Sequence, residues 1–193
     1  GGIGLRTNNR FYLSPFLGDL GDYRTQRRFR TTLDHLRALT HAKPQRILTD
    51  LHPGYFSTGL GERMAEEENL EVLSIQHHEA HFTAILGEHD LLRSHQPILG
   101  VIWDGTGLGT DGNIWGGEFF RFEDQRMTRV GHLPSFPNIG GDKMAHEPRY
   151  AALAWAGDVD RVYDRLEASF SPLPFNNLLH LRPRQKLQTS SVG

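Results

Sequence analysis

The fold of this 193-residue chain is decided by the stretch Ile98-Leu99-Gly100-Val101-Ile102-Trp103-Asp104-Gly105-Thr106-Gly107-Leu108-Gly109-Thr110-Asp111-Gly112. The apolar run 98–103 is short enough for a buried β-strand, and Asp104 follows directly at its carboxyl end. The glycines after Asp104 permit tight turns and let backbone N–H groups approach a ligand closely. We therefore predict a buried strand that delivers an aspartate to a sheet edge. Trp103→Gly is expected to destabilise that strand by about 3–5 kcal/mol.

Strand and helix patterns alternate on the amino-terminal side of this stretch, as is typical of the α/β class. Strands are predicted at 10–13, 46–51 and 71–75, and helices at 23–41, 57–68 and 77–92. On the carboxyl-terminal side a hairpin is predicted from 114–122 and 127–133. Residues 134–193 are predicted to form a connection and then helices at 144–157 and 159–169, and Pro172 and Pro174 are expected to break the segment after the second helix.

Composition places the chain among ordinary globular proteins, with 37% hydrophobic and 23% charged residues. A formal net charge of −2 argues against nucleic acid as the main partner, because phosphate-backbone binding needs a basic surface. The sequence contains no cysteine, which excludes disulfides, thiolate metal ligands and a cysteine nucleophile within it. It also lacks an apolar run of the ~20 residues that a membrane span needs, so we expect a cytoplasmic protein without membrane contact.

A histidine cluster lies in the predicted helix 77–92, within Gln76-His77-His78-Glu79-Ala80-His81. His77 and His81 are one helical turn apart on the same face, whereas His78 points about 100° away. Together with Asp104 they would offer two nitrogens and one oxygen, a set that suits zinc or ferrous iron. The alternative is that they are core or surface histidines without a ligand. The zinc-protease pattern H-E-x-x-H is absent, because Phe82 stands where its second histidine belongs.

The glycine run predicts a phosphate-binding turn for a nucleotide. The residues we expect there are Asp104, Gly105, Thr106, Gly107 and Gly109. Gly116 and Gly117 are a second place where the backbone can approach the nucleotide closely. It is not a P-loop, because no Gly-Lys-Ser/Thr follows, and it opens onto a hairpin where a Rossmann fingerprint needs a helix. A glycine-rich hairpin without a ligand is the alternative.

Two other positions are open to two interpretations. His52-Pro53-Gly54 follows a predicted strand and either lines the same cleft or forms a simple turn. Glu118 either belongs to the site or is a strand residue facing solvent.

The resemblance to a known family rests on several short sequence motifs and on their order along the chain: Ser14 to Leu20, Asp50 to Thr58, Gln76 to His81, Asp104 to Gly112, Ile114 to Glu118, and Gly140-Gly141-Asp142 with Glu147-Pro148-Arg149. In this order, the motifs resemble those of the carbamoyltransferases of nickel-iron hydrogenase maturation, the HypF family. The resemblance covers nearly the whole chain and is weakest at residues 158–186.

The resemblance implies an actin-like ATPase, RNase H-like α/β lobe with a mixed sheet flanked by helices. It implies a divalent metal, zinc or iron, on His77, His81 and Asp104, next to ATP or carbamoyl-adenylate. The activity implied is transfer of a carbamoyl group, derived from carbamoyl phosphate, to a carboxyl-terminal cysteine of the partner HypE. That product matures into the cyanide ligands of the hydrogenase iron. The resemblance does not identify a catalytic residue.

Because family members carry a second actin-like lobe, residues 1–193 are expected to form a single truncated lobe with an incomplete site that is inactive alone. Two other functions compete with carbamoyl transfer to HypE. One is a non-catalytic module that docks onto a maturation partner. The other is O-carbamoyl transfer to a small molecule or threonylcarbamoyl transfer to tRNA, against which the acidic charge balance counts.

Overall fold

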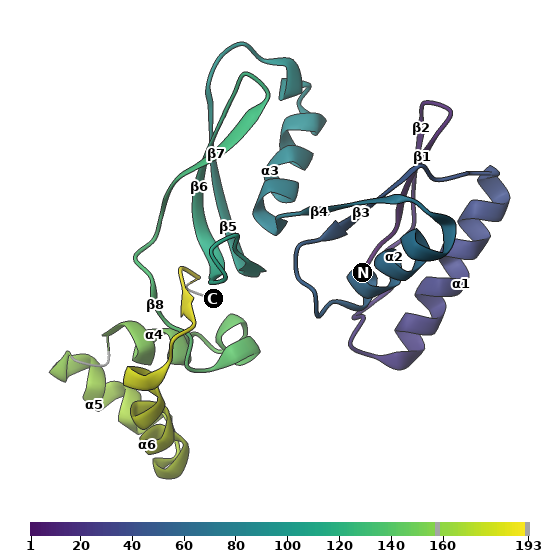
Figure 1. Cartoon of the computed structure of the whole chain (residues 1–193). Coiled ribbons are helices and arrows are strands. Elements are labelled where there is room, and N and C mark those ends of the chain that lie inside the picture. The colour runs from purple at the N-terminus through teal and green to yellow at the C-terminus, as the bar shows by residue number, and fades with distance from the viewer. Residues whose placement is uncertain (157–158, 192–193) are drawn as a thin grey trace. The chain divides into compact units, whose positions relative to one another are not determined.

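The computed structural model describes residues 1–156 and 159–191 and divides into two compact units, Gly1–Ile75 and Gln76–Gly193 (Figure 1). The predicted ends of the helix 144–157 and of the segment 134–193 therefore lie outside the described residues. Each unit is described by itself below. The expectation of a single lobe stays a prediction.

Unit 1 contains two helices and four short strands. Their order is β1 (Gly4–Thr7), β2 (Arg10–Leu13), α1 (Tyr23–Thr40), β3 (Arg46–Asp50), α2 (Phe56–Glu68) and β4 (Glu71–Ile75). The carboxylate of Asp22 accepts the backbone N–H of Thr25 and so caps α1, and His41 ends this helix in the left-handed conformation. All the strands and helices that the sequence predicted before residue 76 are present, within one or two residues at their ends.

The strands of unit 1 form two separate two-stranded sheets (Figure 1). β1 and β2 form an antiparallel hairpin whose turn residues Asn8 and Asn9 both have positive φ, as a two-residue hairpin turn requires. β3 and β4 are parallel and are connected through α2. Sequence analysis missed β1, because two of its four residues are Gly4 and Arg6 and no apolar alternation marks it.

Unit 2 begins with the histidine-bearing helix and continues into the main sheet and a group of helices. In order they are α3 (His77–Glu88), η1 (Leu91–Arg93), β5 (Ile98–Leu108), β6 (Ile114–Glu123), β7 (Arg126–His132), β8 (Phe136–Pro137), η2 (Gly141–Ala145), α4 (Pro148–Ala156), α5 (Asp160–Ser169), α6 (Pro172–Leu181), η3 (Arg182–Arg184) and β9 (Gln188–Thr189). The predicted hairpin and the predicted helix 159–169 are confirmed. A helix at α6 was not expected, but Pro172 occupies its first turn, where a missing N–H costs nothing.

The five-stranded sheet of unit 2 is mixed. β5, β6 and β7 pair antiparallel, whereas β9 pairs parallel with β6 and antiparallel with β8. The helix α3 covers one face of it, and its Phe82 and Leu86 pack with Trp115, Phe120 and Phe122. A Cβ on Gly100 would lie 2.6 Å from the ring of Phe82, so only glycine lets this helix approach the strand so closely. A mixed sheet flanked by helices is the fold class that the sequence predicted.

The prediction of a strand at residues 98–103 is confirmed, but the prediction that this strand is buried was wrong. In β5, Leu99, Val101 and Trp103 point away from α3 and are exposed, and Trp103 retains 71% of its accessible surface. The run is apolar throughout, and a short apolar run does not reveal whether one face or both faces are covered. The expected loss of 3–5 kcal/mol for Trp103→Gly therefore no longer follows.

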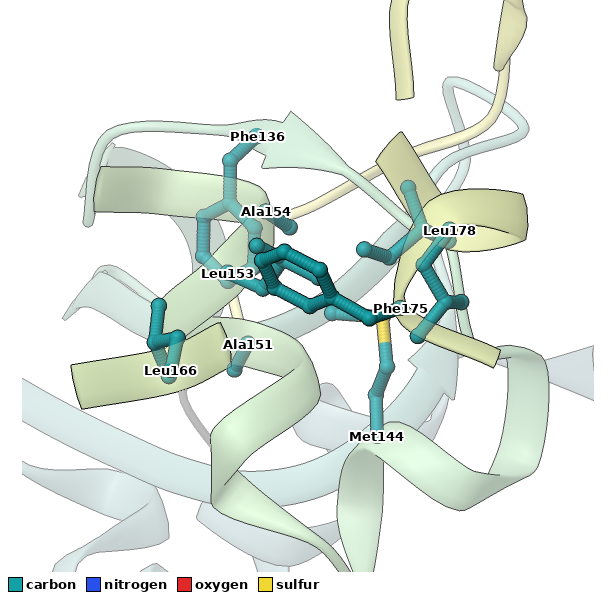
Figure 2. Packing of buried hydrophobic residues seen from close by; sticks show 9 residues of the cluster. Phe136, Met144, Ala151, Leu153, Ala154, Leu166, Phe175 and Leu178 are labelled. Atoms are coloured by element: carbon teal, nitrogen blue, oxygen red, sulfur yellow. The ribbon is translucent and has the colours of Figure 1, made fainter. Parts of the chain in front are cut away.

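The helices after β8 form a second hydrophobic cluster in unit 2 (Figure 2). Its members come from β8, η2, α4, α5 and α6 and include Phe136, Met144, Leu153, Leu166 and Phe175. In the described part of the chain, no helix is both long enough and apolar enough to span a lipid bilayer.

Candidate metal and nucleotide site

The local sequence around Gln76 fixes where the histidines begin. Gln76 is buried, and its side-chain oxygen accepts the backbone N–H of Glu79 at 3.0 Å, which caps α3. Its amide group also donates to the carbonyl oxygen of Leu108 at 3.1 Å. This residue therefore ties the first turn of the helix to the far end of β5. His77 and His81 consequently lie beside Asp104, which stands in the middle of the same strand.

Three side-chain atoms converge at this point. His77 Nε2 lies 2.9 Å from Asp104 Oδ2, His81 Nε2 lies 3.6 Å from the same oxygen, and the two nitrogens are 3.2 Å apart. Three atoms at these separations lie on a circle of radius about 1.9 Å, close to the Zn–N and Zn–O bond lengths of about 2.0–2.2 Å. The three residues that sequence analysis selected as metal ligands are therefore brought together.

The donor set fits a divalent cation. Asp104 Oδ2 is shielded from solvent, and each neutral imidazole can turn the lone pair of Nε2 toward the same spot. The hydrogen bond with the His77 side chain lowers the pKa of the Asp104 carboxyl to about 2, so this group is ionised at neutral pH although burial opposes it. Two nitrogens and one carboxylate oxygen leave coordination positions for other ligands, which is typical of catalytic zinc or non-haem iron sites.

His78 points away from this cluster, as its place on the helix predicted. Its ring is fully buried, and the side-chain amide of Gln76 lies 3.0 Å from its Nδ1. Burial lowers the pKa of this imidazole to about 4, so it is neutral under physiological conditions. His78 therefore belongs to the structure that supports the site.

The glycine run after Asp104 continues the strand for several residues before it turns. β5 extends to Leu108, with an irregularity in its pairing to β6 between Trp103 and Gly107, and the turn itself spans 109–113. A Cβ on Gly107 would lie 2.6 Å from the His78 ring and 3.0 Å from the Cβ of His77. This glycine therefore allows the first turn of α3 to lie directly against the strand.

The turn itself is held by Asp111, whose Oδ1 accepts the backbone N–H of Asn113 and the indole N–H of Trp115. Gly112 has a φ of +79°, a conformation that favours glycine. The guanidinium of Arg129 stacks 4.0 Å from the Trp115 ring centroid.

Gly116 and Gly117 lie inside the sheet, against groups from the end of the chain. A Cβ on Gly116 would lie 2.3 Å from the Cβ of Ser191 and 2.5 Å from the backbone oxygen of Asp104, and one on Gly117 would meet Ser190 and Leu133. The closeness of these backbones explains both glycines without a phosphate. That Asp104, Gly105, Thr106, Gly107, Gly109, Gly116 and Gly117 hold a nucleotide stays a prediction.

The interpretation of Glu118 as a solvent-facing strand residue was wrong. Its side chain is fully buried, accepts the Arg129 guanidinium at 2.6 Å and the Gly116 N–H at 3.2 Å, and also accepts the Ser190 hydroxyl. Ser191 in turn donates its hydroxyl to the Asp104 backbone oxygen at 3.2 Å. Sequence analysis missed Ser190 and Ser191, because nothing in the local pattern indicates that residues so distant along the chain pair with β6.

His52 forms a turn in unit 1. Its Nδ1 accepts the backbone N–H of Gly54 at 3.0 Å, and its ring stacks on Tyr55 at a centroid distance of 4.3 Å. These contacts explain the His-Pro-Gly sequence by local structure. The interpretation that it lines the cleft beside Asp104 stays a prediction.

Fold and site together define an α/β protein with a candidate metal centre between a helix and the edge strand of a mixed sheet. Two family models match the chain: "HypF Kae1-like domain" over residues 2–88, and "Carbamoyltransferase, Kae1-like Domain, second subdomain" over residues 100–193. The chain belongs to the HypF family of carbamoyltransferases.

Curated relatives agree with this assignment. The chain is 38% identical over 192 residues to carbamoyltransferase HypF2 of Cupriavidus necator, which covers 98% of the chain and 23% of that protein. It is 39% identical over 152 residues to carbamoyltransferase HypF of Synechocystis sp., which covers 79% of the chain and 19% of that protein. The chain thus spans about a fifth of the length of these relatives.

Solved structures are similar over the same extent. A full-length HypF in the phosphate- and nucleotide-bound form matches with a TM-score of 0.85 and 25% identity, covering 100% of this chain and 25% of that one. HypF of T. kodakarensis matches with a TM-score of 0.84 and 28% identity, covering 98% of this chain and 27% of that one.

Proposed function

We propose that this chain is the part of a HypF-type carbamoyltransferase that holds a divalent metal beside a carbamoyl-adenylate. It would serve transfer of the carbamoyl group to a cysteine thiolate of a HypE-like partner, in the synthesis of hydrogenase cyanide ligands. The observation that carries the proposal is the convergence of His77 Nε2, His81 Nε2 and Asp104 Oδ2 within 3.6 Å of one another.

The protein's contribution to the metal site is a rigid frame. The buried Gln76 fixes the first turn of α3, and Gly107 lets that turn lie against β5, so the two imidazoles and the carboxylate are held before any ion arrives. Zinc or iron bound there would supply a Lewis acid next to the adenylate.

The chemistry proposed is a displacement at the carbamoyl carbon. The partner's thiolate sulfur attacks that carbon, a C–S bond forms, the C–O bond to the phosphate of the adenylate breaks, and AMP leaves with the bonding electron pair. The step needs no oxidant or reductant. Gly105 and Gly109 donate their backbone N–H groups to Asp104 Oδ1 and to the Asn113 carbonyl, so other N–H groups of the glycine run would steady the negative charge that develops. A related structure in the phosphate- and nucleotide-bound form supports nucleotide binding. The absence of cysteine from this sequence is consistent with an acceptor cysteine on the partner.

The first experiment is metal analysis by inductively coupled plasma mass spectrometry on the purified chain. Wild type is compared with His77→Ala/His81→Ala and with a control, His35→Ala/His95→Ala, which removes two histidines that are not members of the cluster with Asp104. We expect close to one zinc or iron per chain in wild type and in the control, and a loss of at least about tenfold in the site variant. Circular dichroism verifies that all three proteins are folded.

The outcomes separate the competing functions. Metal lost only in the site variant supports the proposal and justifies a nucleotide titration on the loaded protein. Folded protein that takes up no added zinc or iron would favour the non-catalytic docking module. Metal retained in the site variant would contradict the assignment of His77 and His81.

A further inference from the structure

The carboxylate of Asp104 belongs to an irregular part of β5. The pair Trp103–Gly117 and the next pair, Gly107–Trp115, enclose three residues of β5 but only one residue of β6, and Asp104 is the first of those three. Such a bulge bends a strand and re-aims its side chains, and bulges are common next to active sites. The regular pairing of the sheet is therefore interrupted at the residue whose carboxylate approaches the two histidines of the candidate metal site.

A residue from the other end of unit 2 contacts Asp104 at this irregularity. The hydroxyl of Ser191 donates a hydrogen bond to the backbone oxygen of Asp104 at 3.2 Å, across a chain separation of 87 residues. The backbone carbonyl and the carboxylate of an aspartate are attached to the same Cα atom, so a displacement of the first displaces the second. The position of the carboxylate therefore depends on a hydrogen bond that the carboxylate itself does not make.

Ser191 is held by hydrogen bonds of its own segment. Its N–H donates to Thr189 Oγ1 at 3.0 Å, and the N–H of Ser190 donates to the carbonyl of Ile114 at 3.1 Å. The Ser190 hydroxyl also donates to the buried carboxylate of Glu118. Ser191 is buried, so water has little access to compete for its hydroxyl. The hydroxyl donor is thus fixed by the fold before a metal binds.

Gly116 leaves the space in which this hydrogen bond forms. A Cβ at position 116 would lie 2.5 Å from the backbone oxygen of Asp104 and 2.7 Å from the hydroxyl oxygen of Ser191. Any side chain at this position would therefore push the donor and the acceptor apart. The contact needs a hydroxyl at position 191 and the absence of a side chain at position 116, and the sequence provides both.

We propose that Ser191 is a positioning residue for the candidate metal site. Its hydroxyl holds the backbone of Asp104 where the pairing of β5 is interrupted, and it thereby keeps the Asp104 carboxylate within reach of His77 and His81. In this role Ser191 acts through Asp104 and needs no contact with the metal. The inference rests on the metal site of the proposed function, and it adds to that site a residue outside the helix and the strand that carry the ligands.

The neighbouring Ser190 provides a matched control. Both serines are buried, at 5% exposed for Ser191 and 1% for Ser190, and each donates its hydroxyl to an acceptor on the same sheet. The acceptor of Ser190 is Glu118, which is not one of the proposed metal ligands. Ser191→Ala and Ser190→Ala therefore each remove one buried hydroxyl, but only Ser191→Ala removes a bond to a proposed ligand.

Titration of the 193-residue chain with cobalt(II) tests the proposal, because the visible absorption of this ion reports the arrangement of its ligands. We expect Ser191→Ala to bind cobalt at least about tenfold more weakly than wild type, the loss typical of a residue that orients a metal ligand. We also expect a changed visible spectrum, because the Asp104 carboxylate is displaced. Ser190→Ala should keep the affinity and the spectrum of wild type, although it melts at a lower temperature.

Amide hydrogen exchange without metal gives a second measurement, which does not depend on cobalt binding. We expect the segment 104–107 to exchange at least about threefold faster in Ser191→Ala than in wild type, because the bulge loses its hydrogen bond to the end of the chain. The helix α3 should exchange alike in both proteins. Unchanged exchange of the segment 104–107 would show that Ser191 does not hold the backbone of Asp104.

The cobalt titration separates a failure of this inference from a failure of the proposed function. Cobalt bound by wild type and equally well by Ser191→Ala would overturn the positioning role alone. An equal loss of affinity in Ser190→Ala would also overturn it, because a general loosening of the sheet would then explain both variants. A wild-type chain that binds no cobalt would refute the metal site of the proposed function, and the positioning role would fall with it.

Discussion

At the scale of single residues, Glu118 is a buried carboxylate at the centre of a polar network in unit 2. It is fully buried and satisfies three donors, from Arg129, Ser190 and the backbone of Gly116. Removing one member of a buried ion pair leaves the other charge buried without a partner. The resulting loss of stability is larger than the net stabilisation that the intact pair provides. The Glu118 carboxylate therefore holds Gly116 and Ser190 in place, although it contacts none of the proposed metal ligands.

We expect Glu118→Ala to lower the free energy of unfolding by about 3–5 kcal/mol. The matched control is Glu123→Ala on the same strand, where the pair with Arg121 is largely exposed and contributes at most about 1 kcal/mol. Urea denaturation followed by tryptophan fluorescence measures both. Equal losses for the two variants would show that the buried network is not what stabilises β6.

The shared face of His77 and His81 could be predicted from sequence, because it depends on residue spacing. That these residues bind a metal with Asp104 stays a prediction. Imidazoles at positions i and i+4 share a helix face whatever the tertiary fold, and an aspartate after an apolar run lies at a strand end or within a continued strand. The partners Ser190 and Ser191 could not be found in this way. They reach Glu118 and Asp104 through chain separations of 72 and 87 residues, and such contacts are set by tertiary packing.

At the scale of elements, β5 shows that an apolar strand can be covered on one face only. Its inward residues pack beneath α3, whereas Leu99, Val101 and Trp103 lie on the opposite face with their side chains in water. A Leu, Val or Trp on an open face contributes little to folding, because it loses little accessible surface when the chain folds. The stability of the sheet therefore resides in the face toward α3.

We expect Trp103→Ala to change the free energy of unfolding of the 193-residue chain by no more than about 0.5 kcal/mol. Phe120→Ala, on the neighbouring strand, removes a ring that is 1% exposed and is expected to cost about 3–5 kcal/mol. Chemical denaturation with near-ultraviolet circular dichroism follows both variants. A large loss for Trp103→Ala would show that this face is covered in solution.

The helices and strands that sequence analysis found are those with a strong local signal. α1 carries a capping Asp22 and apolar residues at helical spacing, and the hairpin of β6 and β7 closes through Asp124 and Gln125, both with positive φ. The elements it missed, β1, β8, β9 and α6, are short or begin with proline. A two-residue strand such as β9 exists only because β6 and β8 lie on either side of it.

At the scale of the whole molecule, a metal at His77, His81 and Asp104 would bridge two elements of unit 2 and none of unit 1. A ligand that binds the folded state alone stabilises it by mass action, by about 2.7 kcal/mol at a free concentration one hundred times its dissociation constant. The stabilisation should therefore be confined to the unit that holds the ligands.

We expect saturating zinc to raise the melting temperature of unit 2 by roughly 5–10 °C, and a chelator to reverse the change. Hydrogen exchange should slow in α3 and β5 and stay unchanged in α1 and β3, because only the first pair carries ligands. The control is His77→Ala/His81→Ala, which keeps Asp104 but lacks both nitrogens and should not respond to zinc. An equal rise of the melting temperature in that variant, or slower exchange throughout both units, would show that zinc binds elsewhere on the chain. The assignment of the metal ligands, on which the proposed carbamoyl transfer rests, would then fail.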